Sequence, residues 1–322
     1  MTKDFPLARP RLKTALATRG HTQPLKNGTV KPRTFEFEFE EVPVPVIITA
    51  FRRMVRNLDF DICEMAMTTY LCARAHGKPF TAIPVFPVRA FHHGAIVYNT
   101  NAGVQTPKDL EGKKVGVNRG YTVTTGVWAR GILQHEHDVD LSKVTWVRSG
   151  DEHVAEYRPP SNVVSIDPGH TLEELLAAGE IAAAIGVAVQ SPDVKPLIPN
   201  AGEAGLQALR QRGLYPINHT VVIRNELLAA NPDLAPDVFD ALAQAKRIYL
   251  QHLTNGQVDT ASGTDQVFSQ VMAITGDPLP YGIEPNRRTL EAIVQYCIEQ
   301  RILPGAVAIE ELFPENTRTL TA

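Results

Sequence analysis

The stretch Pro107–Arg130, PKDLEGKKVGVNRGYTVTTGVWAR, predicts a short helix, a tight turn, a buried strand over Lys114–Val117 and then a second helix. The second helix is expected to open over Arg119–Thr125, after a glycine-containing turn, and its first turn is rich in threonine. A helix N-terminus presents unpaired N–H groups and a partial positive charge, which together favour a bound carboxylate or phosphate. The stretch therefore predicts an α/β fold with an anion-binding site at the end of a strand.

A simpler reading of the same stretch is that Thr122 or Thr124 caps the helix and binds no ligand. The sequence has no GxGxxG or P-loop motif here, so a nucleotide is not expected. A carboxylate or a simple phosphate remains the expected anion.

The remainder of the chain alternates short apolar strands with helical patterns, which is typical of α/β folds with mostly parallel sheets. Further strands are predicted at 12–17, 34–40, 61–65, 81–85, 94–98, 144–147, 181–185 and 215–224. Further helices are predicted at 46–55, 68–76, 172–178 (with Gly179 as its cap), 238–253, 266–274 and 287–302. The proline-containing stretch 157–168 is expected to form a long functional loop.

The length and net charge of the chain favour a two-lobed protein that does not bind nucleic acid or an anionic membrane. The 322 residues are too many for one ordinary core and suit two lobes. A formal net charge of −3 gives no global field to attract nucleic acid or an anionic membrane, so an anionic ligand must be held by local arginines. The three cysteines, Cys63, Cys72 and Cys297, have no metal-ligand spacing, and we expect buried free thiols.

The N-terminal stretch 1–33 is basic and lacks the apolar run of about 7–15 residues that a secretory signal requires. No later stretch reaches the roughly 18–20 apolar residues of a membrane span. We therefore expect a cytoplasmic protein with no membrane partner.

Two pairs of adjacent polar residues are candidates for acid–base chemistry. His92 and His93 are neighbours, so on a strand only one of them can face a given cleft. Glu152 and His153 follow the predicted strand 144–147, and open α/β sheets bind ligands at the carboxyl ends of their strands. The alternatives are structural histidines for the first pair and a solvated loop for the second.

Glu64 lies among apolar residues, where a carboxylate is costly unless it is paired. It could be held by one of three arginines that come shortly before it, Arg52, Arg53 and Arg56. Thr68 and Thr69 open the next helix and could cap it or donate to a ligand, and His219 lies where the chain is expected to cross between lobes.

Three long stretches, 51–93, 107–133 and 144–163, resemble the 4,5-dihydroxyphthalate decarboxylase family. The most specific segments are GYTVTTGVWARG and GDEHVAEY, and the resemblance extends over about 12–303. That family is similar to the type II periplasmic binding proteins. The resemblance implies two α/β lobes, joined by two crossover strands, with the ligand in the cleft between them. Lobe one would comprise 1–98 and 217–322, and lobe two 99–216.

The implied activity is conversion of 4,5-dihydroxyphthalate to 3,4-dihydroxybenzoate and carbon dioxide, without a cofactor. We assign proton transfer to four residues, His92, His93, Glu152 and His153. Substrate binding is assigned to Arg52, Glu64, Thr68, Thr69, Arg89, Arg119, Tyr121, Thr122, Thr124, Thr125, Arg130 and His219. A divalent metal chelated by the substrate's hydroxyl oxygens is an alternative, and its ligands would be the four proton-transfer residues.

Two other functions remain open from the sequence. The same cleft could belong to a solute-binding protein that captures a small aromatic carboxylate without reacting with it, or to a lyase acting on a related hydroxylated aromatic acid. The expected partner is a small aromatic dicarboxylate and not a nucleic acid. The sequence does not decide between a monomer and a homo-oligomer.

Overall fold

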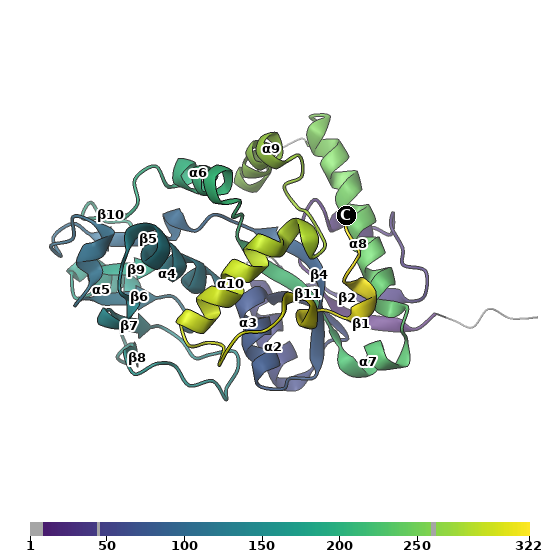
Figure 1. The fold of residues 1–322 in the computed structure, drawn as a ribbon, viewed down its shortest axis with the longest axis horizontal. Helices are drawn as coiled ribbons and strands as arrows, with labels where there is room; N and C mark the ends of the chain where they lie inside the picture. The colour runs from purple at the N-terminus through teal and green to yellow at the C-terminus, as the bar shows by residue number, and fades with distance from the viewer. Residues whose placement is uncertain (1–8, 44–45, 259–261) are drawn as a thin grey trace, which may run out of the picture.

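A computed structural model describes residues 9–43, 46–258 and 262–322 and shows two lobes, each built on one β-sheet (Figure 1). The five strands of the first sheet, in spatial order, are β2 (Glu36–Glu40), β1 (Arg11–Ala15), β3 (Ile62–Ala66), β11 (Ile217–Arg224) and β4 (Phe80–Arg89). The six strands of the second are β10 (Val194–Pro196), β5 (Ile96–Asn99), β9 (Ala183–Ile185), β6 (Lys114–Val117), β7 (Thr145–Arg148) and β8 (Val163–Ser165). The α/β fold with two lobes is thus confirmed.

The expectation of mostly parallel sheets needs correction, because both sheets are mixed. In the first sheet β1 pairs in parallel with β2 and β3, whereas β11 runs antiparallel to both of its neighbours. In the second, β6 is parallel to β7 and β9, whereas β5 pairs antiparallel with β9 and β10. The cause is the chain path: β11 returns from the second lobe and enters the middle of the first sheet.

The helices cover the faces of both sheets. Those packed with the first lobe are α1 (Gln23–Lys26), α2 (Ile47–Asn57), α3 (Met67–Ala75), α7 (Asn225–Ala230), α8 (Leu234–Thr254) and α9 (Gly263–Thr275). Those of the second lobe are α4 (Thr124–His137), α5 (Leu172–Ala178) and α6 (Ala201–Arg212). The last, α10 (Arg287–Glu299), contacts both α3 and α4 and lies across the junction of the lobes (Figure 1).

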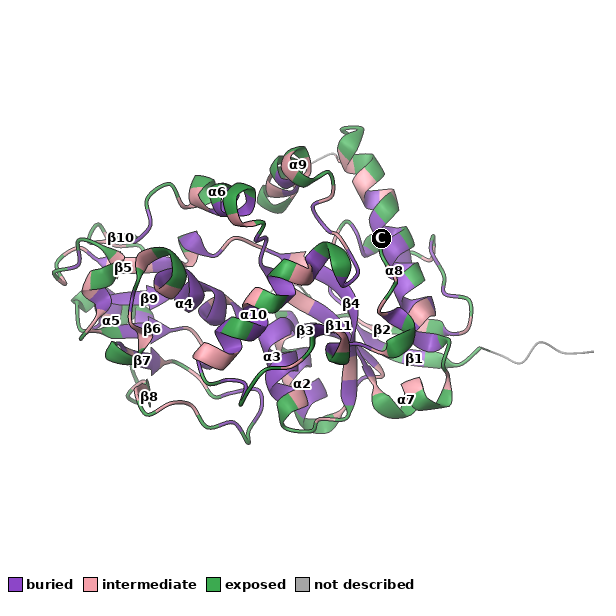
Figure 2. Ribbon diagram, viewed as in Figure 1, coloured by how far each residue is buried: buried purple, intermediate pink, exposed green. Residues whose placement is uncertain are grey.

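Amphipathic patterns in the sequence correctly predicted which faces are buried. In α2 the apolar face of Ile47, Phe51, Met54 and Val55 is buried, while Ile48 is only half-buried. Figure 2 shows the same division, with buried strands at the centre of each lobe and exposed outer helix faces. All three cysteines are free and buried, as expected.

The predicted helix over 172–178 is confirmed, and Gly179 ends it in the left-handed conformation with φ +76°. Several short elements were missed: β8 lies inside the stretch predicted as a loop, and β10, α1 and α6 have no predicted counterpart. The helix expected to open over Arg119–Thr125 begins at Thr124, near the end of that range.

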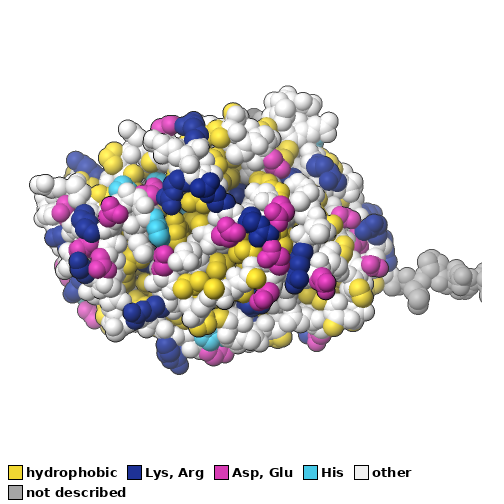
Figure 3. All heavy atoms as spheres, in the orientation of Figure 1, with side chains coloured by type: hydrophobic (Ala, Val, Ile, Leu, Met, Phe, Trp, Pro, Cys, Tyr) yellow, Lys and Arg dark blue, Asp and Glu magenta, His cyan; other side chains and the backbone are white. Residues whose placement is uncertain are grey.

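Positive and negative side chains are interspersed on the face drawn in Figure 3, as the small net charge suggests. Within the described ranges, no helix combines the length and apolarity needed to cross a bilayer. Residues 1–8, the start of the basic N-terminal stretch, lie outside the described residues. The lobe bounds and the cytoplasmic location stay predictions.

Candidate functional site

A cavity of about 1070 Å³ opens between the end of the first sheet and the turn that follows β6. The first lobe supplies most of its wall, from the loop after β1, the start of α2, the end of β4, the start of β11, and the helices α8 and α9. The second lobe contributes Arg119. Polar groups that line it include Arg19, His21, Asn218 and His219, which lie beside the apolar Ile47 and Ile48.

Beneath the cavity floor, three side chains form a hydrogen-bonded relay. The Glu64 carboxylate is fully buried in β3 and accepts two hydrogen bonds from the Arg19 guanidinium, each 2.8 Å long. It also accepts from the backbone N–H of Ala17 and lies 2.6 Å from His219 Nδ1. This leaves His219 Nε2, the other ring nitrogen, for a ligand in the cavity.

The electrostatics of the relay keep Glu64 ionised. Burial by itself would raise the pKa of Glu64, but the Arg19 charge and the hydrogen bond with His219 outweigh it and lower the pKa well below the usual carboxyl range. A permanent carboxylate on Nδ1 fixes the ring orientation of His219 and stabilises the positive charge that the imidazole carries when protonated. Glu64 is therefore placed to orient His219, and it does not itself line the cavity.

Replacing Glu64 with glutamine is expected to destabilise the protein by about 3–5 kcal/mol, because the Arg19 charge loses its buried partner. Urea unfolding of the variant at neutral pH measures this. The matched control is Glu36→Gln, which breaks an exposed pair with Arg9 and should cost less than about 1 kcal/mol. Equal losses in the two variants would contradict the buried relay.

His21 is a second imidazole in the cavity wall. The side chain is buried between Tyr249 and Phe268, with ring centroids 5.7 Å and 6.5 Å away, and within the described residues its Nε2 has no hydrogen-bond partner. Burial lowers the pKa of His21 to about 4, so the ring is neutral at pH 7. The preceding residue must be small, because a Cβ on Gly20 would lie 2.4 Å from the Tyr249 ring.

Arg119 is the cation that the second lobe presents to the cavity. Its backbone adopts the left-handed conformation, with φ +68°, and its N–H donates to Ser149 Oγ at 2.7 Å. In the part of the chain that the structure describes, its side chain forms no ion pair, and its buried Nε lacks an acceptor. A strained backbone that aims an unpaired guanidinium into a cavity is typical of a ligand contact.

The anion site predicted at the helix start exists, but the protein fills it with its own carboxylate. Glu152 accepts hydrogen bonds from the N–H of Tyr121 at 2.7 Å, and from the N–H and Oγ1 of Thr122 at 3.0 Å and 2.7 Å. A Cβ at Gly120 would lie 2.5 Å from the same carboxylate, so glycine is required there. These bonds hold the turn away from helical geometry, and α4 therefore begins only at Thr124.

The threonines assigned to the substrate join the two lobes. Thr68 Oγ1 donates to the carbonyl of Thr122 at 2.6 Å and lies 2.8 Å from Thr124 Oγ1, so the N-termini of α3 and α4 meet. Thr69 Oγ1 lies 3.2 Å from His153 Nδ1 in the same seam. All of these groups are buried, so the seam between the lobes excludes solvent at this point.

A charge cluster flanks this seam. The Asp151 carboxylate lies 2.6 Å from Arg52 and 2.8 Å from Arg56, both on α2, and so links the first lobe to the loop after β7. Arg56 also donates to the carbonyl of Glu152 at 2.8 Å. Arg52 is therefore engaged in holding the lobes together.

The remaining predicted residues lie apart from one another. His92 pairs with Asn218 at 2.8 Å beside the cavity, whereas His93 pairs with Glu136 of α4 at 2.9 Å. Arg130 is buried in the second lobe, where it stacks 3.8 Å over the Tyr121 ring. Thr125 is half-buried at the start of α4. Arg89 borders the cavity, but its guanidinium donates to Tyr215, Pro280 and Asn286, none of which lines that cavity.

The metal site considered from the sequence, with His92, His93, Glu152 and His153 as ligands, is not assembled as one cluster among the described residues. Its four candidate ligands make the separate contacts given above, and within the described ranges no group of three or more His, Cys, Asp or Glu residues is arranged to hold an ion. The structure instead places Arg119 and His219 in the wall of one cavity. Two residues that were not predicted from the sequence, Arg19 and His21, line the same cavity. They follow the carboxyl end of β1, so the strand-end rule used for the other candidates would have found them.

Three buried histidines make stability depend on pH. Burial lowers the pKa of His21, His92 and His153 to about 4 each, against about 6.5 in the unfolded chain. Between those values the unfolded state binds more protons, so the free energy of unfolding should fall as pH falls from about 6.5 to 4. Urea unfolding at several pH values measures this dependence. His92→Gln should make the free energy of unfolding depend less on pH, whereas replacement of the exposed His170 with glutamine should leave the pH dependence unchanged.

A family described as NMT1/THI5 like matches residues 50–158. The chain is 34% identical over 219 residues to a 4,5-dihydroxyphthalate decarboxylase of Comamonas testosteroni, an alignment covering 64% of this chain and 66% of the relative. It is 38% identical over 144 residues to the enzyme of that name from Pseudomonas putida, covering 42% of this chain and 55% of the relative. Less than two thirds of either relative's length is therefore matched.

Solved structures extend the likeness to the whole fold. The periplasmic aliphatic sulphonate binding protein SsuA of Escherichia coli aligns with a TM-score of 0.54 at 13% identity, over 97% of this chain and all of that one. The desulfurization enzyme DSZB aligns with a TM-score of 0.50 at 14% identity, over 95% of this chain and 96% of that one. The protein is thus a homologue of the 4,5-dihydroxyphthalate decarboxylases, built on the type II periplasmic-binding-protein fold.

Proposed function

We propose that the protein decarboxylates a hydroxylated aromatic dicarboxylate, with 4,5-dihydroxyphthalate as the first substrate to test. The observation that carries the proposal is the presence, in one cavity, of the His219 imidazole held by Glu64 and of the Arg119 guanidinium, which forms no ion pair with the described residues. A fixed cation anchors a carboxylate, and an oriented imidazole transfers a proton near neutral pH. The names of the two sequence relatives support the reaction class.

The chemistry sets what the site must supply. Direct loss of carbon dioxide from an aromatic ring would leave an unstable aryl anion. The accessible route first protonates the ring carbon that bears the departing carboxylate. The carbon–carbon bond then breaks, and its electron pair restores the aromatic ring. In 4,5-dihydroxyphthalate one hydroxyl is para to that carbon, so electron density released from its oxygen reaches the position where the proton arrives.

His219 is proposed as the acid. Its protonated ring delivers the Nε2 proton to the ring carbon, while the Glu64 carboxylate at Nδ1 stabilises the positive charge before transfer. After carbon dioxide leaves, the neutral imidazole takes a proton from solvent. One proton is consumed for each carbon dioxide released, and no electrons are gained or lost overall.

Arg119 is proposed to hold the carboxylate that stays on the ring, through charge-assisted hydrogen bonds that include its unpartnered Nε. His21, neutral at pH 7, is proposed to accept a hydrogen bond from a ring hydroxyl and so promote release of electron density. The ring would lie against the apolar start of α2, where Ile47 and Ile48 line the cavity.

A solute-binding protein is the second candidate, because SsuA shares the fold and is a binding protein. Binding of a carboxylate requires a cation, but a hydrogen-bonded relay beneath the first cavity would not be needed for binding alone. The relay of Arg19, Glu64 and His219 therefore favours an enzyme. DSZB, an enzyme on the same fold, supports the view that this architecture can carry a reaction.

The deciding experiment incubates the purified protein with 4,5-dihydroxyphthalate, after chelator treatment and again with added divalent metal. Chromatography should detect 3,4-dihydroxybenzoate with stoichiometric carbon dioxide. Saturable binding by calorimetry, with no product in either arm, would identify a binding protein instead. A panel of related hydroxylated aromatic acids, run in parallel, separates this substrate from another acid turned over faster.

A further inference from the structure

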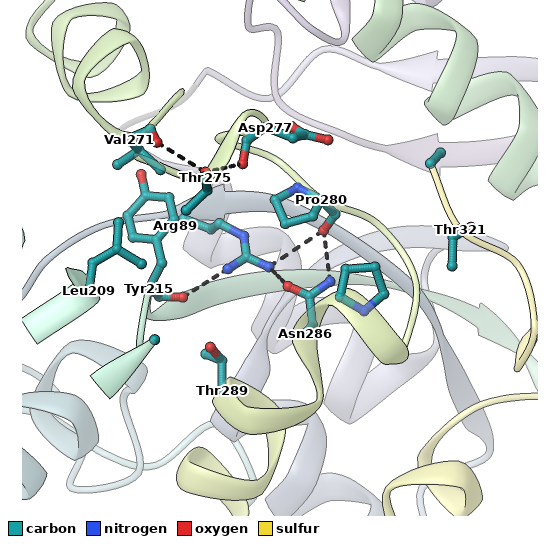
Figure 4. Close-up of a pocket in the computed structure, with 13 residues that line it drawn as sticks. Arg89, Leu209, Tyr215, Val271, Thr275, Asp277, Pro280, Asn286, Thr289 and Thr321 are labelled. Atoms are coloured by element: carbon teal, nitrogen blue, oxygen red, sulfur yellow. Dashed lines mark hydrogen bonds between the residues drawn. The ribbon is translucent and has the colours of Figure 1, made fainter. Parts of the chain in front are cut away.

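A second cavity, of about 420 Å³, lies beside the segments that connect the lobes and shares Arg89 with the first cavity. Figure 4 shows Arg89, from the end of β4, in its wall together with Tyr215, which precedes β11. The cavity is completed by residues of α6, α9 and the start of α10, and it is large enough for a molecule with one aromatic ring.

Arg89 is a buried cation that forms no ion pair with any carboxylate of the described residues. Its guanidinium donates to the carbonyl of Tyr215 at 2.8 Å, to the carbonyl of Pro280 at 3.5 Å and to Asn286 Oδ1. All three acceptors are uncharged, and within the described ranges Arg89 forms no ion pair. Burial lowers the pKa of Arg89 only to about 10, so the charge persists at neutral pH.

Two polar groups in this wall are left without partners. In the portion of the chain that the structure describes, Arg89 Nε and the hydroxyl of Tyr215 are buried and make no hydrogen bond. The two side chains are held rigidly, because the guanidinium packs 5.4 Å from the Tyr215 ring centroid and 5.7 Å from that of Phe86. Unsatisfied buried donors cost free energy that a bound acceptor would recover.

The other residues of the wall indicate what kind of ligand would carry the hydrogen-bond acceptor. Leu209, Val271 and Pro285 give it an apolar side suited to a ring. Among the side chains that line the wall, the one carboxylate is Asp277, which pairs with Lys246 at 2.7 Å and accepts from the N–H of Leu279, so that it does not repel an anion strongly.

We infer that this second cavity is a separate binding site for a small aromatic monocarboxylate, whose oxygens accept from Arg89 and Tyr215. The site lies where both connections between the lobes pass, since Arg89 precedes the first crossover and Tyr215 the second. A ligand here would bridge the two connecting segments without entering the first cavity.

The test uses 4-fluorobenzoate as the probe, observed by fluorine NMR. The full chain should show two classes of site, and Arg119→Gln should remove the class in the first cavity. In that background, Tyr215→Phe should weaken the remaining binding about five- to tenfold, because one hydrogen bond is lost. Arg89→Lys, which retains charge but lacks Nε–H, should weaken it further.

The matched control is Tyr281→Phe. Tyr281 has a buried hydroxyl that also lacks a partner within the described residues, but it does not line the second cavity, so its removal should leave probe binding unchanged. Thermal unfolding of each variant verifies folding. Loss of all binding in Arg119→Gln alone, or equal affinities with and without the Tyr215 hydroxyl, would overturn the inference.

Discussion

His219→Asn is expected to lower kcat for decarboxylation about 10²–10⁴-fold while the protein stays folded. The asparagine amide can still donate to Glu64 in place of Nδ1, so the buried carboxylate keeps a partner. What it lacks is a second nitrogen that can carry a proton to the ring carbon. Steady-state kinetics with 4,5-dihydroxyphthalate measure kcat and KM, and thermal unfolding confirms that the fold survives.

The matched control for this variant is His170→Asn, since His170 is exposed and should leave kcat unchanged. A second variant, His219→Ala, creates space in which added imidazole can act, and partial recovery of kcat with imidazole is expected. If His219→Asn retained activity within about twofold of the parent, the relay would be structural and the acid would have to be another group.

Arg119→Gln is expected to lower kcat/KM about 10²–10³-fold, because a charge-assisted contact to a desolvated carboxylate is lost. Glutamine retains hydrogen-bonding capacity but not the charge. If Arg119 anchors the retained carboxylate equally in the ground and transition states, the loss should fall mainly on KM. Kinetics over a wide substrate range separate the two parameters.

Arg301→Gln is the control for Arg119, because Arg301 is also an arginine in the left-handed conformation, with φ +58°, but it is exposed and does not line the first cavity. Its kinetics should match those of the parent. An Arg119→Gln variant with unchanged KM and kcat would remove Arg119 from the site, whereas unchanged substrate binding without turnover would place it in the chemical step.

Local sequence patterns predicted most of the strands and helices, because periods of two and of about 3.6 residues reflect which side of an element is buried. They also predicted that polar residues at strand ends would mark the site, and Arg119 is such a case. The patterns failed for short elements such as β8 and β10, whose three residues are too few to show a period.

Partners of the charged groups were harder to predict. The sequence required a partner for Glu64 and offered the nearby arginines of α2, but these bind elsewhere: Arg52 and Arg56 hold Asp151, and Arg53 holds Asp59 at 2.8 Å. The anion site after β6 was likewise predicted, but not that Glu152 would occupy it.

By itself, then, the sequence determined the order of most strands and helices, the strand-end location of the cation Arg119, and the need of a buried carboxylate for a partner. Only the tertiary structure decided that Glu64 is held by Arg19, 45 residues before it, and holds His219, 155 residues after it. The physical reason is that periodic patterns of apolar residues report only which side of a single strand or helix is buried, so they concern residues that are close in sequence. Which cation meets which carboxylate depends instead on how β11 returns from the second lobe to lie beside β3.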